Sequence, residues 1–219
     1  MIFFSWNVRG LTDPSRKYTV RDEIADVNLQ FGSVDFICLQ EVKIIDFLLQ
    51  CTYKFLWQSG SFFHTNHVNG SGGAVTFISP KWQSHMVSWG VDPSNQAVWT
   101  LFELHGKPFG IINIYASNDA HDRRSLWSWL AFSLPLATWV LCWDFNMIEK
   151  FVDKQSHNPF RWNLGEREAW FFLKNKLSLY DPNSTFSPAN FQESHWFTWS
   201  NLQVRNNQVL KRFDRAMLS

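Results

Sequence analysis

The chain has 219 residues, of which 45% are hydrophobic and 18% charged, and its formal net charge is +1. This balance excludes an intrinsically disordered chain. It also excludes a strong overall basic field, so any attraction to nucleic acid would come from a local patch or from metal ions. The length suits one large domain, predicted over residues 1–219, and the 13 Trp and 21 Phe predict a core rich in aromatic rings.

The chain has three cysteines, which form no CxxC motif and are too few for a disulfide framework: Cys38, Cys51 and Cys142. Cys38 and Cys142 lie in apolar runs, where a buried and reduced thiol is usual. The first residues, MIFFSWNVRG, lack the regions of a signal peptide. Together these features predict a nuclear or cytoplasmic protein that is not secreted.

The first half of the chain alternates between the two hydrophobic periodicities that indicate strands and helices. The expected elements in chain order are a strand over 2–8, a helix over 16–31 that Gly32 stops, a buried strand over 34–42 that carries Glu41 near its end, a short helix over 44–53, a turn at 70–73 and a strand over 74–79. No repeat or low-complexity linker interrupts this half.

The second half continues in the same way. Its expected elements are a hairpin of strands over 97–106 and 108–117 joined at Gly106-Lys107-Pro108, a helix over 120–133, a strand over 138–145, a helix over 165–177, a turn at 181–184, and two last strands over 195–200 and 209–218. Strands that alternate with helices, together with a hairpin, predict an α/β sandwich with mixed sheets.

Residues 126–143, LWSWLAFSLPLATWVLCW, carry no formal charge and are long enough to raise the alternative of a membrane span. Pro135 lies in the middle of this segment, where it would break a helix. The residues before Pro135 have helical spacing, and those after it favour a strand. A helix, a turn and a buried strand therefore describe the segment better than a membrane helix does.

Polar side chains follow several of the predicted strands at the point where the apolar run stops: Asn7, Glu41, Tyr115, Asp144 and Asn146. Each of them alone has an ordinary interpretation, because asparagine often forms turns and loop carboxylates are usually solvated. Ligand sites in α/β proteins commonly form where strand ends meet loops. Gathered at one edge, these groups would suit a hard divalent cation and a phosphate-containing substrate.

Six short motifs follow one another along the chain: WNVRGL, LQEVK, GGAVTFIS, NIYAS, WDFN and RFDRAML. In this order and spacing, they resemble the endonuclease/exonuclease/phosphatase superfamily over essentially the whole chain. The likeness is strongest to the apurinic-type endonuclease domain of plant LINE-type (non-LTR) retrotransposons. This resemblance implies a four-layer αββα sandwich with two mixed sheets, DNase I-like, which cleaves phosphoester bonds with Mg²⁺ or Mn²⁺. It also implies DNA as the substrate, and a reverse transcriptase domain in the parent element that the present chain does not include.

The resemblance also implies roles for individual residues. Glu41 would be the main metal ligand with Asn7 beside it, since a hard cation prefers oxygen ligands. Asp144 would orient or deprotonate the attacking water, and Asn146 would hold a phosphate oxygen. The remaining assignments are Tyr115 near the scissile phosphate, Asp214 near the metal and the substrate strand, and Arg9 and Lys43 as contacts to backbone phosphates.

The chain departs from the family pattern at several positions. Trp143 stands where the family has glycine, Ser117 where it has proline, and Lys211 where LINE relatives often carry a small hydroxyl residue. The family's closing Asp-His pair does not follow Asp214, which predicts that the last strand is missing and that catalysis is weakened or lost.

Three hypotheses of function therefore stand side by side. The first is a Mg²⁺-dependent DNA endonuclease, the second is a catalytically inactive remnant that acts at most as a binding module, and the third is a phosphatase of small phosphoesters. The retrotransposon-like RFDRAM favours the first over the third, although a metal site alone does not identify its substrate.

Overall fold

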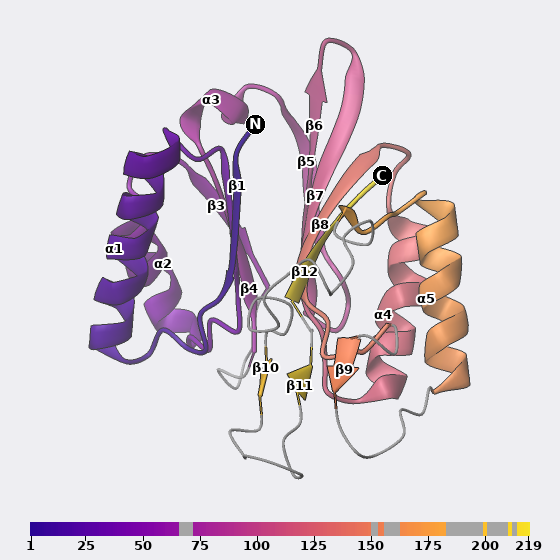
Figure 1. Ribbon diagram of the computed structural model, residues 1–219. Helices are drawn as coiled ribbons and strands as arrows, with labels where there is room; N and C mark the ends of the chain where they lie inside the picture. Colours follow the sequence, from indigo (N-terminus) through magenta and orange to yellow (C-terminus); the bar gives the residue numbers. More distant parts are fainter. Residues whose placement is uncertain (66–71, 150–152, 156–162, 183–198, 201–209, 212–213) are drawn as a thin grey trace. The chain divides into compact units, whose positions relative to one another are not determined.

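The computed structural model describes residues 1–65, 72–149, 153–155, 163–182, 199–200, 210–211 and 214–219 (Figure 1). The chain divides into two compact units. The first contains Met1–Tyr115 and Leu136–Trp143, and the second contains Ala116–Pro135 and Asp144–Ser219. The prediction of a single domain over 1–219 stays a prediction, and each unit is described by itself.

The first sheet lies in the first unit, and its strand order is β1-β2-β4-β3. Its strands are β1 (Phe3–Asn7), β2 (Phe36–Gln40), β4 (Ala74–Ile78) and β3 (Ser61–His64). Strand β1 pairs with β2 in parallel, with Asn7 opposite Gln40, whereas β4 runs antiparallel to both of its neighbours. Because β1 and β2 are parallel and in register, the residues that follow them emerge at the same edge of the sheet.

Helices α1 (Pro14–Phe31) and α2 (Asp46–Leu56) cover one face of this sheet (Figure 1). Helix α1 starts where the Asp13 side chain accepts a hydrogen bond of 2.9 Å from the Ser15 amide, and it stops at Gly32, which has a φ of 82°. The buried side chains between helices and sheet include Val20, Ile24, Leu39, Tyr53 and Phe77. The predicted helix is confirmed, but only part of its apolar spacing faces this layer: Ile24 and Val27 pack here, whereas Tyr18 and Phe31 are exposed.

In the second sheet, the strands that belong to the first unit lie in the order β8-β7-β6-β5. These strands are β8 (Thr138–Asp144), β7 (Lys107–Tyr115), β6 (Ala97–Leu104) and β5 (Met86–Val91). The predicted hairpin of β6 and β7 is confirmed, but its turn falls on His105 and Gly106, with φ of 52° and 73°. Two left-handed residues match the twist of an antiparallel pair, which explains why Lys107 and Pro108 belong to the strand instead.

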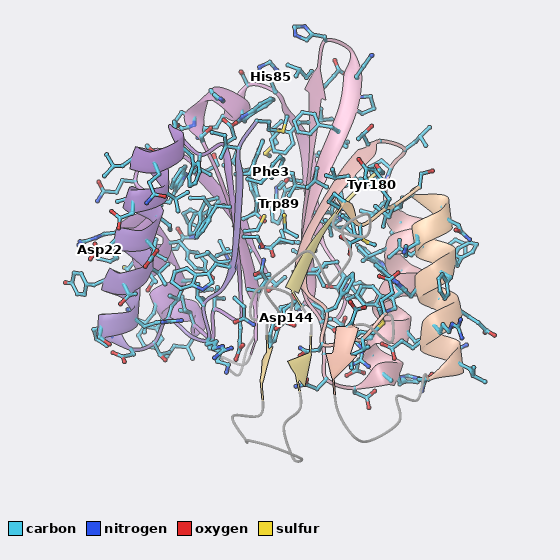
Figure 2. All side chains as sticks on the ribbon, viewed as in Figure 1. Phe3, Asp22, His85, Trp89, Asp144 and Tyr180 are labelled. Atoms are coloured by element: carbon cyan, nitrogen blue, oxygen red, sulfur yellow. The ribbon has the colours of Figure 1, made fainter. Side chains whose placement is uncertain are left out.

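An apolar layer joins the two sheets of the first unit. It contains Phe36, Cys38 and Ile78 from the first sheet and Phe102, Ile111 and Cys142 from the second, and Figure 2 shows Phe3 among these side chains. Both cysteines are free and buried, as the sequence predicts. A hydrogen bond with the Cys142 thiol, together with burial, raises the pKa of Cys38 above its ordinary value, so Cys38 remains a thiol at neutral pH.

The second unit contains helices α4 (Ala120–Ser133) and α5 (Leu164–Lys176). They pack around Trp127, Phe145 and Trp170, whose ring centroids lie 4.6–5.2 Å apart. Its strands are β9 (Lys154–Gln155), β10 (Trp199–Ser200), β11 (Leu210–Lys211) and β12 (Asp214–Leu218), of which the first three form a small antiparallel sheet. The helices that the resemblance expects as a fourth layer thus belong to this unit.

The fold class is confirmed as α/β with two mixed sheets and helices. Residues 126–143 form the end of α4, a turn and β8, as predicted, and no helix among the described residues is long and apolar enough to cross a membrane. Four of the described elements were not predicted from the sequence, namely β3, β5, β9 and the short helix α3 (Pro80–Gln83). The predicted turns at 70–73 and 181–184, and the strands over 195–200 and 209–218, lie partly outside the described residues.

Candidate active site

The carboxyl ends of β1 and β2 form the first part of the candidate site. Beyond the strands, parallel pairing continues through three backbone hydrogen bonds: Val8 N to Gln40 O at 3.0 Å, Gly10 N to Glu41 O at 2.7 Å and Leu11 N to Val42 O at 2.8 Å. The Asn7 side chain accepts a hydrogen bond of 3.0 Å from the Arg9 amide. The loops that carry Asn7 and Glu41 are therefore joined to each other by their backbones.

Left-handed backbone marks both loops, because Arg9, Glu41 and Lys43 have φ of 54°, 55° and 49°. Each such residue costs about 1–2 kcal/mol relative to ordinary backbone. The loop after β2 is held in this shape from its other side by Val42 N to Gly73 O at 3.2 Å and Lys43 N to Gly72 O at 2.7 Å. Strain that the surroundings maintain in this way is typical of functional sites.

The Glu41 carboxylate already holds a cationic group. Its Oε1 lies 2.5 Å from Lys43 Nζ, and the two side chains are 17% and 43% exposed. The lysine that was expected to contact phosphate or solvent therefore contacts Glu41. A half-buried carboxylate at a strand end, with an amide oxygen on the neighbouring parallel strand, is a donor set that fits a hard divalent cation.

Tyr115 is the last residue of β7 and is half-buried. Its amide donates to Gln96 O at 2.8 Å, so the loop between β5 and β6 supports it. Asp92 holds that loop together, because its carboxylate accepts hydrogen bonds of 2.6 Å from the Gln96 and Ala97 amides. Tyr115, Asn7 and Glu41 all belong to the first unit.

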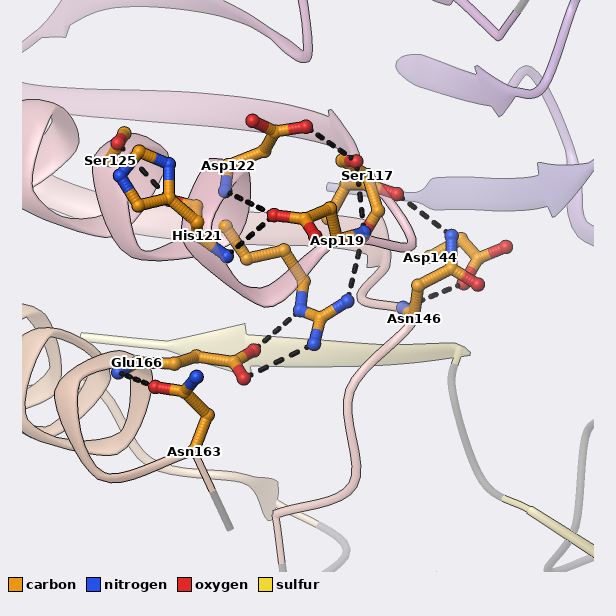
Figure 3. Close-up of polar contacts among 11 residues, drawn as sticks. Ser117, Asp119, His121, Asp122, Ser125, Asp144, Asn146, Asn163 and Glu166 are labelled. Carbon is orange, nitrogen blue, oxygen red and sulfur yellow. Dashed lines mark hydrogen bonds and ion pairs between the residues drawn. The ribbon is translucent and has the colours of Figure 1, made fainter.

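Asp144 and Asn146 form the second part of the candidate residue set, a group that lies in the second unit (Figure 3). Asp144 Oδ1 accepts a hydrogen bond of 3.1 Å from the Asn146 amide, and Asn146 has a φ of 48°. Asn146 Nδ2 donates to Ala116 O at 2.7 Å, and the Ala116 amide donates to Asp144 O at 3.0 Å. Asp144 and Asn146 are therefore tied to the loop that follows β7.

A buried ion pair that sequence analysis missed supports this loop. Arg123 donates from Nη1 to Ser117 O at 2.9 Å, and from Nε and Nη2 to the two oxygens of Glu166, the latter at 3.1 Å (Figure 3). Both side chains are less than a tenth exposed. The one signal in the sequence was NLGE, in which Asn163 caps α5 by accepting from the Glu166 amide at 3.1 Å, but that pattern does not reveal Arg123.

Asp119, His121 and Asp122 lie close enough together to hold a metal ion, and all three are exposed. Their hydrogen bonds have another explanation. Asp119 caps α4 by accepting from the His121 and Asp122 amides at 2.8 and 3.2 Å, bonds that lower its pKa, while Asp122 accepts from Ser117 Oγ at 2.9 Å. These contacts are those of a helix N-terminus.

Two other positions lie outside the description. Asp214 is the first residue of β12, but its side chain is outside the described part of the chain. The same holds for the side chain of Trp143 in β8. The structure thus brings Asn7 and Glu41 together at one sheet edge, and Asp144 and Asn146 together in one loop.

The fold agrees with comparisons to known proteins. The profile of the endonuclease/exonuclease/phosphatase family matches residues 4–219, so the chain belongs to this family. No individual curated protein matches the sequence.

Many solved structures are similar in fold to this chain. An AP endonuclease from Leishmania major superimposes with a TM-score of 0.70 at 14% identity, and the match covers 99% of this chain and 78% of the Leishmania chain. The catalytic domain of Xenopus laevis APE2 gives 0.64 at 16% identity, covering 100% and 82%. The endonuclease domain of TRAS1, a telomere-specific non-LTR retrotransposon, gives 0.59 at 11% identity, covering 99% and 84%.

Proposed function

We propose that the protein is a DNA endonuclease of the retrotransposon-associated apurinic type, which hydrolyses phosphodiester bonds with Mg²⁺ or Mn²⁺. The observation that carries the proposal is the pair of oxygen-bearing side chains, Asn7 and Glu41, on adjacent parallel strand ends. Membership of the family and the likeness to two AP endonucleases and to the TRAS1 endonuclease domain support the choice of DNA as substrate.

Glu41 and Asn7 are the residues that would hold the metal ion. The Glu41 carboxylate accepts a lysine ammonium in the structure, which indicates that its surroundings tolerate a cation there. Once bound, the ion supplies Lewis-acid stabilisation of charge on the phosphate oxygens. Lys43 Nζ would then leave Glu41 and be available for a backbone phosphate.

The other residues are proposed to act on water and phosphate. One oxygen of Asp144 is fixed by the Asn146 amide, and a carboxylate held in this way suits a group that orients or deprotonates water. Asn146 uses Nδ2 toward Ala116 O, and the second hydrogen of that amide nitrogen is the proposed donor to a phosphate oxygen. Tyr115, Arg9 and Asp214 keep the roles that the resemblance implies.

A second candidate function is a non-catalytic module that binds nucleic acid or protein. The Glu41–Lys43 ion pair is the observation that favours it, because a lysine can neutralise the carboxylate permanently in place of a metal. In that case, addition of Mg²⁺ or Mn²⁺ leaves the thermal unfolding midpoint unchanged. The endonuclease hypothesis instead predicts that the midpoint rises with metal concentration.

Nicking of supercoiled plasmid in Mg²⁺ tests the proposal. Glu41→Ala and Asp144→Ala are each expected to slow nicking by about 10²–10⁴-fold. Asp22→Ala is the matched control, because Asp22 is an exposed carboxylate on α1 that contacts Arg21 (Figure 2), and its loss should leave the rate unchanged. Equal nicking by all four proteins, or none by any of them, would refute the endonuclease assignment.

A further inference from the structure

A polar pair interrupts the apolar layer between the two sheets of the first unit. Gln40, the last residue of β2, donates from Nε2 to Asn113 Oδ1 at 2.8 Å, and Asn113 lies on β7 of the other sheet. Gln40 is 1% exposed and Asn113 is fully buried. Polar groups are costly to bury, and apolar side chains alone would hold the two sheets together. The presence of this pair therefore indicates a further role.

The pair reaches three strands of the first sheet. Asn113 Nδ2 donates to two backbone oxygens, Leu39 O at 3.2 Å on β2 and Val75 O at 2.8 Å on β4. Leu39 and Val75 face each other in the β2–β4 register. Gln40 Nε2 also contacts Ser5 Oγ on β1 at 3.0 Å and Cys38 O at 3.2 Å. One side chain from β7 thus fixes the backbone of β2 and β4, and its partner extends the contact to β1.

These contacts lie next to the proposed site in sequence. Gln40 directly precedes Glu41, and Asn113 stands two residues before Tyr115 on the same strand. Val75 is the second residue of β4, which follows the glycines whose carbonyls hold the Val42 and Lys43 amides. Any shift of β7 against β2 would therefore move the left-handed loop at Glu41.

We propose that Asn113 and Gln40 are positioning residues that set the place of the Glu41 loop relative to Tyr115. Apolar contacts such as those of Phe36, Phe102 and Ile111 hold the sheets together but tolerate sliding, because they have no preferred direction. Directional hydrogen bonds remove that freedom. The consequence for catalysis rests on the proposed endonuclease function, where a displacement of about 1 Å can cost about 10²-fold in rate.

Amide hydrogen exchange measured by NMR tests the positioning role without any need for activity. Asn113→Leu keeps the branched shape and the number of heavy atoms of the side chain but removes every hydrogen bond of the amide. The Val42 and Lys43 amides are expected to exchange at least about tenfold faster than in Thr100→Val, the matched control. Thr100 is also fully buried and lies on neighbouring β6, where its hydroxyl has no hydrogen-bond partner among the described residues. Equal exchange rates at these two amides in the two variants would overturn the proposal.

Gln40→Met provides a second test should Asn113→Leu fail to fold. It removes the Gln40 donor, and with it the contacts to Asn113, Ser5 and Cys38, but leaves both bonds of Asn113 to backbone, so a smaller acceleration at the same two amides is expected. Conservative Asn113→Asp retains the acceptor toward Gln40 but loses both donors, and should resemble Asn113→Leu. Wild-type exchange rates at Val42 and Lys43 in Gln40→Met would contradict the proposal.

Nicking kinetics provide a second measurement, the Mg²⁺ dependence of the rate, which would not change if Asn113 had a purely structural role. Asn113→Leu is expected to raise the Mg²⁺ concentration for half-maximal nicking about tenfold while KM for DNA stays unchanged, whereas Thr100→Val leaves both values as they are. If wild-type protein does not nick DNA, the proposed function fails, and hydrogen exchange alone decides the positioning role.

Discussion

The two parts of the candidate residue set, one in each unit, are held by different kinds of interaction. Around Asn7 and Glu41, backbone hydrogen bonds between parallel strand extensions fix the loops, and buried amides lie beneath them. Around Asp144 and Asn146, a short loop is tied by its own side chains and by Arg123, which Glu166 holds from α5. The first part therefore depends on sheet register, and the second on one buried ion pair between two helices.

Both parts place a proposed site residue in left-handed backbone, but the residue types differ. Glu41 gains nothing locally from that conformation, whereas asparagine tolerates it well and Asn146 also bonds to Ala116 O. The proposed metal-binding role of the carboxylate would account for a glutamate in this conformation. Asn146 stabilises its loop through the bond to Ala116 O, in addition to its proposed contact with phosphate.

The largest expected effect concerns the ion pair of the second part. Arg123→Ala leaves the Glu166 carboxylate buried without its partner, which should lower the free energy of unfolding by about 3–5 kcal/mol. Urea denaturation at pH 7 measures this loss. The matched control is Arg21→Ala, which breaks the exposed Arg21–Asp22 pair of 2.8 Å and should cost at most about 1 kcal/mol. Similar losses in both variants would show that the buried pair has no special role.

A smaller effect separates the two left-handed residues. At Glu41 and at Asn146, the variant with glycine should have a free energy of unfolding about 1 kcal/mol larger than the variant with alanine, because only glycine adopts positive φ without cost. Relative to wild type, Glu41→Gly should cost under about 0.5 kcal/mol, while Asn146→Gly should cost about 1 kcal/mol through its lost hydrogen bond. Denaturation of these four variants checks the order. A larger loss for Glu41→Gly than for Asn146→Gly would contradict the contrast.

A further effect of similar size lies at the opposite end of β2 from Glu41, where Asp35 precedes the strand. Burial alone would raise the pKa of Asp35, but hydrogen bonds from Lys81 and the Ile2 amide outweigh it and lower the pKa. Its contribution is therefore present above the unfolded pKa of about 4 and is lost as pH falls through the lower folded pKa. Asp35→Asn should cost about 1 kcal/mol at pH 7 because the Lys81 side chain is 60% exposed.

Unfolding of wild type and Asp35→Asn across pH 7 to 2 measures this prediction. The difference between the two proteins should shrink only below about pH 4. A difference that stays constant down to pH 2 would show that the carboxylate charge is not what stabilises the start of β2.

Local sequence patterns were enough for the elements that carry their own signals. The helix over 120–133 matches α4 because Asp119 caps it and its apolar spacing is regular, and the strands of Glu41 and Asp144 were visible as apolar runs that stop at an acid. Strand β5 escaped because Val87 and Trp89 stay exposed at 58% and 49%, so its pattern lacks a buried face that sequence alone can detect.

Local sequence patterns could not predict the residues that support the candidate loops. Arg123 and Glu166 are separated by 43 positions, and Gln40 and Asn113 by 73. Nothing local distinguishes a buried arginine or asparagine from a solvated one, because the difference lies in a partner that only folding brings near.

The amino-acid sequence by itself determined which segments become strands and helices, and which polar side chains end them, since both depend on neighbours in the chain. Tertiary structure decided that Asn7 and Glu41 share one sheet edge, that Lys43 lies on Glu41, and that Asn113 and Arg123 support the loops. These pairings depend on strand register and burial, which arise only when distant segments pack and exclude water.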